Sequence, residues 1–354
     1  MNAPLSTQEV ADGFAAGPRY FPHSLDIAAR RVLMLDLPVE TYLAESFLDD
    51  RLFRSGPRGG WLGEDDFLAM AGQLPAPTDA PGFIFHVGHC GSTLLSRLLA
   101  ALGGFPVREP TPLRVLADAR CEADKPWDPL GEARYRALID AFVRSWARRP
   151  EGAATAIVKA TSLSSGLAPD LMAAAPGASA LTVRIPLPSY LAALLAPDEP
   201  SADLMRGARV RLSRLASLCG GDPGVRLHAL SPGELAALSW LAEASTLAGL
   251  AQAEPGRVMA LDFEGFLSRP GEILHAVAAH FGLPAAPDDT ERAIASPIMS
   301  RYSKSPDQGF TPDDRAAQQA ESAARNASEI AKGRAMVEGL VGRYEGLAGV
   351  SDWL

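Results

Sequence analysis

The feature that most constrains this chain is residues 83–99, where an apolar run, a glycine-containing turn and an apolar helical pattern follow one another. Residues 83–87 (FIFHV) are nearly all apolar, which is typical of a strand buried on both faces of a parallel sheet. Residues 93–102 carry leucines at helical spacing,. The short loop at 88–92 joins the two. The segment therefore predicts a buried strand, a tight turn and a helix in direct succession.

Such a strand–turn–helix unit is suited to binding a phosphate group. The first amides of a helix lack intrahelical acceptors, and the helix dipole adds positive potential at the same place. Gly88 and Gly91 let the backbone turn and approach an anion closely,. An anion with a charge of about −2 is the expected guest; a turn that only caps a helix is the alternative interpretation. The predicted binding residues are Gly88, His89, Cys90, Gly91, Ser92 and Thr93.

Two other phosphate-binding loops fit this segment poorly. A Walker A loop, G-x-x-x-x-G-K-[ST], would need glycine in place of His86 and lysine in place of Ser92,. A phosphatase loop, His-Cys-x5-Arg, matches His89 and Cys90, but six residues rather than five precede Arg97. An ordinary ATP or GTP P-loop and a cysteine-dependent phosphatase are therefore both disfavoured.

The rest of the chain predicts an α/β fold. Short apolar runs recur at 156–158, 180–183 and 258–261, with helical patterns between them. This alternation predicts three layers, with a parallel sheet flanked by helices.

Two regions of the chain lie outside that alternation: the first 78 residues, and an insertion within the α/β domain. Residues 1–78 are predicted to be a mostly helical N-terminal extension, including a helix capped near Ser24 and Asp26,. Residues 79–354 form the α/β domain, with a helical insertion at about 201–254.

Composition excludes several classes of function. The net charge of −9 and the lack of clustered Lys and Arg argue against nucleic-acid binding,. Three cysteines without C-x-x-C spacing predict neither a disulfide framework nor a zinc site,. No apolar run approaches the ~20 residues of a membrane helix, and the first ten residues do not resemble a signal peptide. We therefore expect a cytoplasmic protein with no bound metal and no membrane partner, whose oligomeric state no pattern indicates.

From residue 82 to about 315 the chain resembles the sulfotransferases, which use 3′-phosphoadenosine 5′-phosphosulfate (PAPS). Their loop reads roughly P-[KR]-S-G-[TS]-T-[LW], and residues 88–94 read GHCGSTL. Further matches follow in the family's order: VREPT at 107–111, IVK at 157–159, VRIP at 183–186, and LDFE, SRP and HFGLP between 261 and 284. The resemblance implies a P-loop NTPase-like fold and transfer of a sulfuryl group from PAPS, without a metal. The acceptor would be a hydroxyl or amine on a small molecule, glycan or peptide.

The resemblance also implies three catalytic residues. Glu109 is the general base that removes the proton of the acceptor. His89 stands where the family has Lys or Arg, and it stabilises the charge that develops on the leaving phosphate. Lys159 follows a predicted strand, at the sheet edge where ligands of α/β proteins gather.

The remaining predicted donor-binding residues lie further along the chain. Arg184 follows a predicted strand and suits bidentate phosphate binding. Arg301 and Lys304 lie in a late polar loop that the family places near the 3′-phosphate of the donor. The family's serine after this arginine is Ala192 here, and Ser189 is the nearest substitute. Two alternative functions stay open: a kinase-like phosphotransferase, and a nucleotide-binding protein that has lost catalysis.

Overall fold

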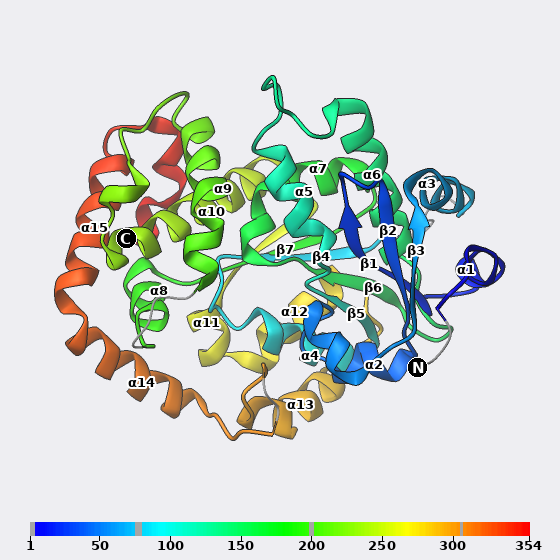
Figure 1. Ribbon diagram of the computed structural model, residues 1–354. Coiled ribbons are helices and arrows are strands. Elements are labelled where there is room, and N and C mark those ends of the chain that lie inside the picture. Colours follow the sequence, from blue (N-terminus) through cyan, green and yellow to red (C-terminus); the bar gives the residue numbers. More distant parts are fainter. Residues whose placement is uncertain (1–3, 75–79, 198–201, 305–306) are drawn as a thin grey trace.

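The computed structural model describes residues 4–74, 80–197, 202–304 and 307–354. Its centre is a five-stranded parallel sheet with the order β5-β6-β4-β7-β8. The strands are β4 (Gly82–His86), β5 (Gly104–Arg108), β6 (Thr155–Lys159), β7 (Ala180–Arg184) and β8 (Val258–Asp262). In Figure 1, helices cover both faces of this sheet: α5 (Pro112–Arg120), α7 (Ala168–Ala174) and α10 (Pro232–Ala253) above, and α4 (Ser92–Ala101) and α12 (Pro270–His280) below. The predicted α/β fold with a parallel sheet between helices is confirmed.

Strand β4 occupies the middle of the sheet because its residues suit burial on both sides. All five are buried, and the rings of Phe83 and Phe85 stack with centroids 5.5 Å apart. From β4 the chain visits β5 and β6 on one side and then crosses to β7 and β8 on the other. The strand order thus reverses at β4. Ligands of open α/β sheets bind outside the carboxyl ends of the strands at such a point.

Strand β5 was missed in the sequence analysis, which predicted four strands. Pro106 interrupts its pattern, and proline cannot donate a ladder hydrogen bond. The strand lies at the edge of the sheet, where proline is tolerated,. It pairs in parallel with β6, so that Arg108 lies opposite Lys159. This register brings the residues that follow β5 and β6 to the same place.

The prediction of a mostly helical N-terminal extension is wrong over residues 20–36. A helix was expected near Ser24–Leu33, but β1 (Tyr20–Asp26) and β2 (Arg31–Asp36) form an antiparallel hairpin there. The carboxylate of Asp26 accepts the amide of Ala29, so the residue expected to cap a helix closes a turn instead. With β3 (Gly59–Gly63) they make a three-stranded sheet. The helical elements of this region are α1 (Thr7–Phe14), α2 (Val39–Ala44), η1 (Asp50–Ser55) and α3 (Glu64–Gln73).

Two arginines of the α/β domain attach the N-terminal region. Arg108, which is 1% exposed, donates to the carbonyls of Tyr42 and Glu45 and to Ser96. Arg148 donates to three further backbone carbonyls, those of Phe14, Gly17 and Tyr20. The segment after α2 is thereby held beside the carboxyl end of β5. The predicted domain boundary at residues 78 and 79 lies outside the described residues.

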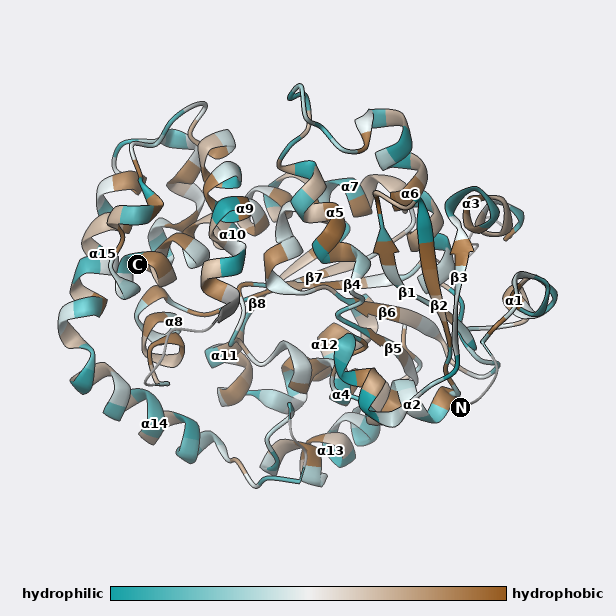
Figure 2. Cartoon of the chain, in the orientation of Figure 1, coloured by the Kyte–Doolittle hydropathy of each residue, from teal (hydrophilic) through white to brown (hydrophobic). Residues whose placement is uncertain are grey.

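Helix α10 is the longest in the described chain, and most of its residues are buried. Ser231 and Glu234 form a reciprocal capping box at its start, with Pro232 at the first helical position,. In Figure 2 the strands of the central sheet are largely hydrophobic, whereas the outer helix α14 is mostly hydrophilic. The remaining elements are α6 (Gly131–Trp146), η2 (Ser162–Leu167), α8 (Leu187–Leu194), α9 (Ala202–Leu218), η3 (Leu227–Ala229), α11 (Phe263–Ser268), α13 (Pro287–Ala295), η4 (Pro297–Ser300), α14 (Pro312–Arg325), α15 (Ala327–Val341) and η5 (Glu345–Trp353).

No helix within the described ranges is both long enough and apolar enough to span a lipid bilayer.

Candidate functional site

The loop between β4 and α4 has the backbone of an anion-binding turn. Gly88, His89 and Gly91 have φ angles of 76°, 49° and 71°, in the left-handed region that favours glycine,. Helix α4 begins at Ser92, and no side chain caps its first turn. Its first intrahelical bond runs from the amide of Leu95 to the carbonyl of Gly91. The preceding amides of α4 therefore have no intrahelical acceptor, and the positive end of the helix dipole lies at the loop.

Gly91 is required for packing as well as for its backbone angle. A Cβ built on it would lie 2.0 Å from the ring of Phe263, the first residue of α11. Real Cβ atoms do not approach so closely, so any side chain here would displace that ring.

A cavity of about 480 Å³ opens in front of this loop. All residues from Gly88 to Leu94 line it, and so do residues from several other parts of the chain. Glu109 is the one carboxylate among the described lining residues. The basic lining residues are Arg51, Arg114, Lys159, Arg211, Arg301, Lys304 and Arg315. Three of these cations, Arg51, Arg211 and Arg315, pair with carboxylates outside the lining. The lining still carries more cations than carboxylates, in a chain whose net charge is −9, and this suits an anionic ligand,.

Glu109 and Lys159 form an ion pair at the wall of this cavity. The amide of Glu109 also donates to the carbonyl of Lys159 over 2.7 Å, which continues the ladder between β5 and β6. The Lys159 side chain is 1% exposed, and this burial lowers its pKa even though Glu109 favours its charged form. The pair places a carboxylate and a buried cation together beside the anion loop.

His86, the last residue of β4, takes part in the site although the sequence analysis gave it no role. Its Nδ1 accepts the amide of Gly88 over 2.9 Å, so in the neutral ring the proton is on Nε2,. Burial, followed by the nearby charge of Lys159, lowers the pKa of His86 well below its usual range. The uncharged imidazole therefore fixes the first turn of the loop. Its place at the carboxyl end of the central strand is the signal that could have identified it.

Arg301 and Lys304 reach the cavity from a segment that is fixed at Ser303. The carbonyl of Ser303 accepts from Arg97 over 3.0 Å and from Ser46 over 3.1 Å. Arg97, which is not a lining residue, thus holds the backbone of this segment. The segment also bonds back on itself through a bridge between Arg301 and Gly309. The structure accordingly places both predicted basic residues with the loop.

Arg184 and Ser189 are not among the lining residues of the cavity. The guanidinium of Arg184 stacks on the ring of Trp353, 3.6 Å from its centroid, in the last turn of η5. The Ser189 hydroxyl donates to Glu264 over 2.6 Å. The structure thus brings together Gly88–Thr93, Glu109, Lys159, Arg301 and Lys304, but not these two. Their predicted roles in donor binding stay predictions.

Cys90 is placed as a structural residue. It is fully buried, and its thiol donates to the carbonyl of Val183 over 3.5 Å. Burial raises the pKa of this thiol to about 12. A nucleophilic cysteine needs the opposite shift. The guanidinium of Arg97 donates to Ser303, Ala44 and Ser46 and is not part of the cavity lining. Both observations argue against the phosphatase interpretation of the loop.

Fold and site together define an α/β protein with a glycine-containing anion loop at the carboxyl edge of a parallel sheet. No known family model matches the chain, and no curated protein matches it. Among solved structures it is similar to the sulfotransferase domain from the curacin biosynthetic pathway, with a TM-score of 0.40 and 13% identity over 71% of this chain and 99% of that chain. It is also similar to sulfotransferase STF9 from Mycobacterium avium, with a TM-score of 0.40 and 12% identity over 73% of this chain and 79% of that chain.

Proposed function

We propose that the protein transfers a sulfuryl group from PAPS to a hydroxyl or amine acceptor. The observation that carries the proposal is the cavity in front of residues 88–94, which combines helix-start amides, basic side chains and one carboxylate. A phosphosulfate needs several donors around its oxygens, and a transfer step needs a base within reach. The loop amides and the cations supply the donors, and Glu109 supplies the base, in one cavity.

In this proposal the amides of the loop and of the first turn of α4 bind the 5′-phosphosulfate of the donor. The acceptor oxygen or nitrogen attacks sulfur, and the bond from sulfur to the bridging phosphate oxygen breaks. The carboxylate of Glu109 takes the proton of the acceptor, and 3′-phosphoadenosine 5′-phosphate leaves. His89 and Lys159 stabilise the negative charge that develops on that phosphate.

Ligand-induced stabilisation tests donor binding. Thermal unfolding is measured with 3′-phosphoadenosine 5′-phosphate, with ATP and Mg²⁺, and with GTP and Mg²⁺. A ligand at 100 times its dissociation constant stabilises by about 2.7 kcal/mol. We expect the first compound alone to raise the unfolding temperature. Stabilisation by ATP and Mg²⁺ instead would favour the kinase-like alternative.

Transfer is tested separately, with ³⁵S-labelled PAPS and a panel of hydroxyl and amine acceptors. Label should appear in an acceptor with the wild-type protein and not with Glu109→Gln. Binding of 3′-phosphoadenosine 5′-phosphate without transfer to any acceptor would favour the nucleotide-binding protein that lacks catalysis.

A further inference from the structure

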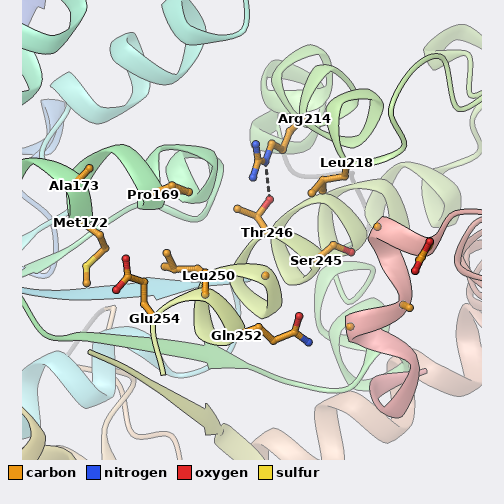
Figure 3. Close-up of a pocket in the computed structure, with 16 residues that line it drawn as sticks. Pro169, Met172, Ala173, Arg214, Leu218, Ser245, Thr246, Leu250, Gln252 and Glu254 are labelled. Carbon is orange, nitrogen blue, oxygen red and sulfur yellow. Dashed lines mark hydrogen bonds between the residues drawn. The ribbon is translucent and has the colours of Figure 1, made fainter. Parts of the chain in front are cut away.

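A second cavity lies among the helices beside α10, and α9 lines both this cavity and the one at the anion loop. Its volume is about 660 Å³, within the range of roughly 300–1,000 Å³ typical of small-molecule sites,. Figure 3 shows its walls, which come from α7, α9, α10 and η5. None of its lining residues also lines the cavity at the loop. The two spaces are therefore separate candidates for ligands.

One basic side chain, Arg214 of α9, lines this groove, and no carboxylate of the described residues lies within ion-pair distance of it. It is half-buried, and its Nε donates to the hydroxyl of Thr246 over 2.9 Å (Figure 3). That hydroxyl in turn donates to the carbonyl of Ala242. In the described part of the chain, no hydrogen bond or ion pair engages the Nη groups of Arg214. Two donor groups of a charged side chain are thus left for a ligand.

The charges around Arg214 do not remove the need for a partner. Burial lowers the pKa of Arg214, and Asp170 is the acidic residue that acts on it. Asp170 is itself engaged, because it accepts from Tyr135 over 2.7 Å and pairs with Arg120 at 3.4 Å. A half-buried guanidinium without a close carboxylate costs free energy, and an anion bound at its Nη groups would recover that cost.

The rest of the lining indicates what kind of anion fits. Met172, Leu218 and Leu250 supply apolar surface to the groove. Two carboxylates also line the groove, Glu345 and Glu254, and Glu254 pairs with Arg257 at 3.5 Å. With Arg214 as the one cation of the described lining, these carboxylates disfavour a dianion such as phosphate more strongly than a monoanion,. A polar hydroxyl, that of Ser245, is buried in the wall with no hydrogen-bond partner among the described residues. Charge and shape together therefore select a monoanion with an apolar body.

We propose that this groove binds a monocarboxylate with an apolar chain or ring, its carboxylate paired with the Nη groups of Arg214. The apolar part lies against Met172, Leu218 and Leu250. The site is independent of the function proposed for the loop cavity, and binding there does not require the transfer reaction.

Isothermal titration calorimetry with octanoate as the probe tests the site, with octan-1-ol as the uncharged match. The wild-type protein should bind octanoate at one site, and at least tenfold more tightly than octan-1-ol. Arg214→Gln should weaken octanoate binding by about tenfold or more, the usual scale for losing a hydrogen bond to a charged group. Arg214→Lys, which keeps the charge, should retain part of the affinity.

A steric variant serves as a second test, because Arg214→Gln also removes the bond to Thr246. Gly249 of α10 lines the groove, and a Cβ built on it meets no atom within 4 Å. Gly249→Leu should fill the groove, block octanoate and leave the unfolding temperature unchanged or higher. The proposal is overturned if the wild-type protein does not bind octanoate, or if Arg214→Gln and Gly249→Leu both bind it as the wild type does.

Discussion

Replacing His86 tests how the anion loop keeps its shape. In His86→Leu the amide of Gly88 loses the acceptor that lies 2.9 Å away. A buried donor left without a partner costs about 1–3 kcal/mol. If that cost falls on the loop conformation that binds the donor, the affinity for 3′-phosphoadenosine 5′-phosphate drops by about 5- to 150-fold. Titration calorimetry measures this drop directly.

The matched control is His86→Asn, whose side-chain oxygen takes the position of Nδ1 and still accepts the amide of Gly88. We expect His86→Asn to bind the nucleotide within a few-fold of the wild type, while His86→Leu does not. Equal affinities in His86→Leu and the wild type would refute the role assigned to His86. Equal losses in both variants would mean that the imidazole acts through its volume rather than through this hydrogen bond.

His86 also predicts a dependence of stability on pH. Its pKa is lowered in the folded protein, so below about pH 6.5 the unfolded chain binds a proton that the folded one does not. Its stabilising effect is complete above that pH and is lost as the pH falls toward the lowered value, by up to about 1.4 kcal/mol per pH unit. His23, also buried with a lowered pKa, adds to the wild-type slope. Denaturant unfolding measured from pH 7 to pH 5 should show a smaller loss of unfolding free energy for His86→Asn than for the wild type. If the dependence of that free energy on pH is the same in both proteins, His86 is not the group that causes it.

Three further predictions concern the loop and its neighbours. Glu109→Gln should abolish transfer and leave nucleotide affinity within a few-fold; unchanged turnover would remove Glu109 as the base. Gly91→Ala should lower the free energy of unfolding by roughly 2–5 kcal/mol, because of the left-handed φ at this position and the close contact with Phe263,. Gly103→Ala is the control: its φ is 95° and the space around it is open, so it should show the backbone cost alone. Cys90→Ser should keep transfer activity, and iodoacetamide should not label Cys90 in the folded protein because its thiol is buried with a raised pKa; loss of activity together with labelling would restore the phosphatase interpretation.

The strand–loop–helix unit could be predicted because local chemistry decides it. A nearly all-apolar strand, glycines at two left-handed positions and a leucine stripe all indicate one structure, and these features agree across residues 83–102. Lys159 was found for a related reason, because it ends a predicted strand and the parallel sheet brings strand ends to one edge. Glu109 was found only through the family resemblance, since the strand that precedes it, β5, was not predicted.

What could not be predicted depends on contacts between distant segments. The β1–β2 hairpin was missed because Asp26 caps a turn as readily as a helix, and pairing with β3 decides between them. Arg184 follows a strand as expected, yet Trp353, far along the chain, covers its guanidinium. No local sequence pattern predicts that contact. From the sequence alone, His86 is one more residue of a largely apolar strand, and only the structure shows its hydrogen bond with Gly88.

A crystal structure with bound 3′-phosphoadenosine 5′-phosphate tests the central claim most directly. We predict that its 5′-phosphate accepts hydrogen bonds from the amides between His89 and Leu94, with Lys159 and Lys304 within reach of the same group. A nucleotide phosphate bound elsewhere, with these amides left in contact with solvent, would contradict the assignment of the loop.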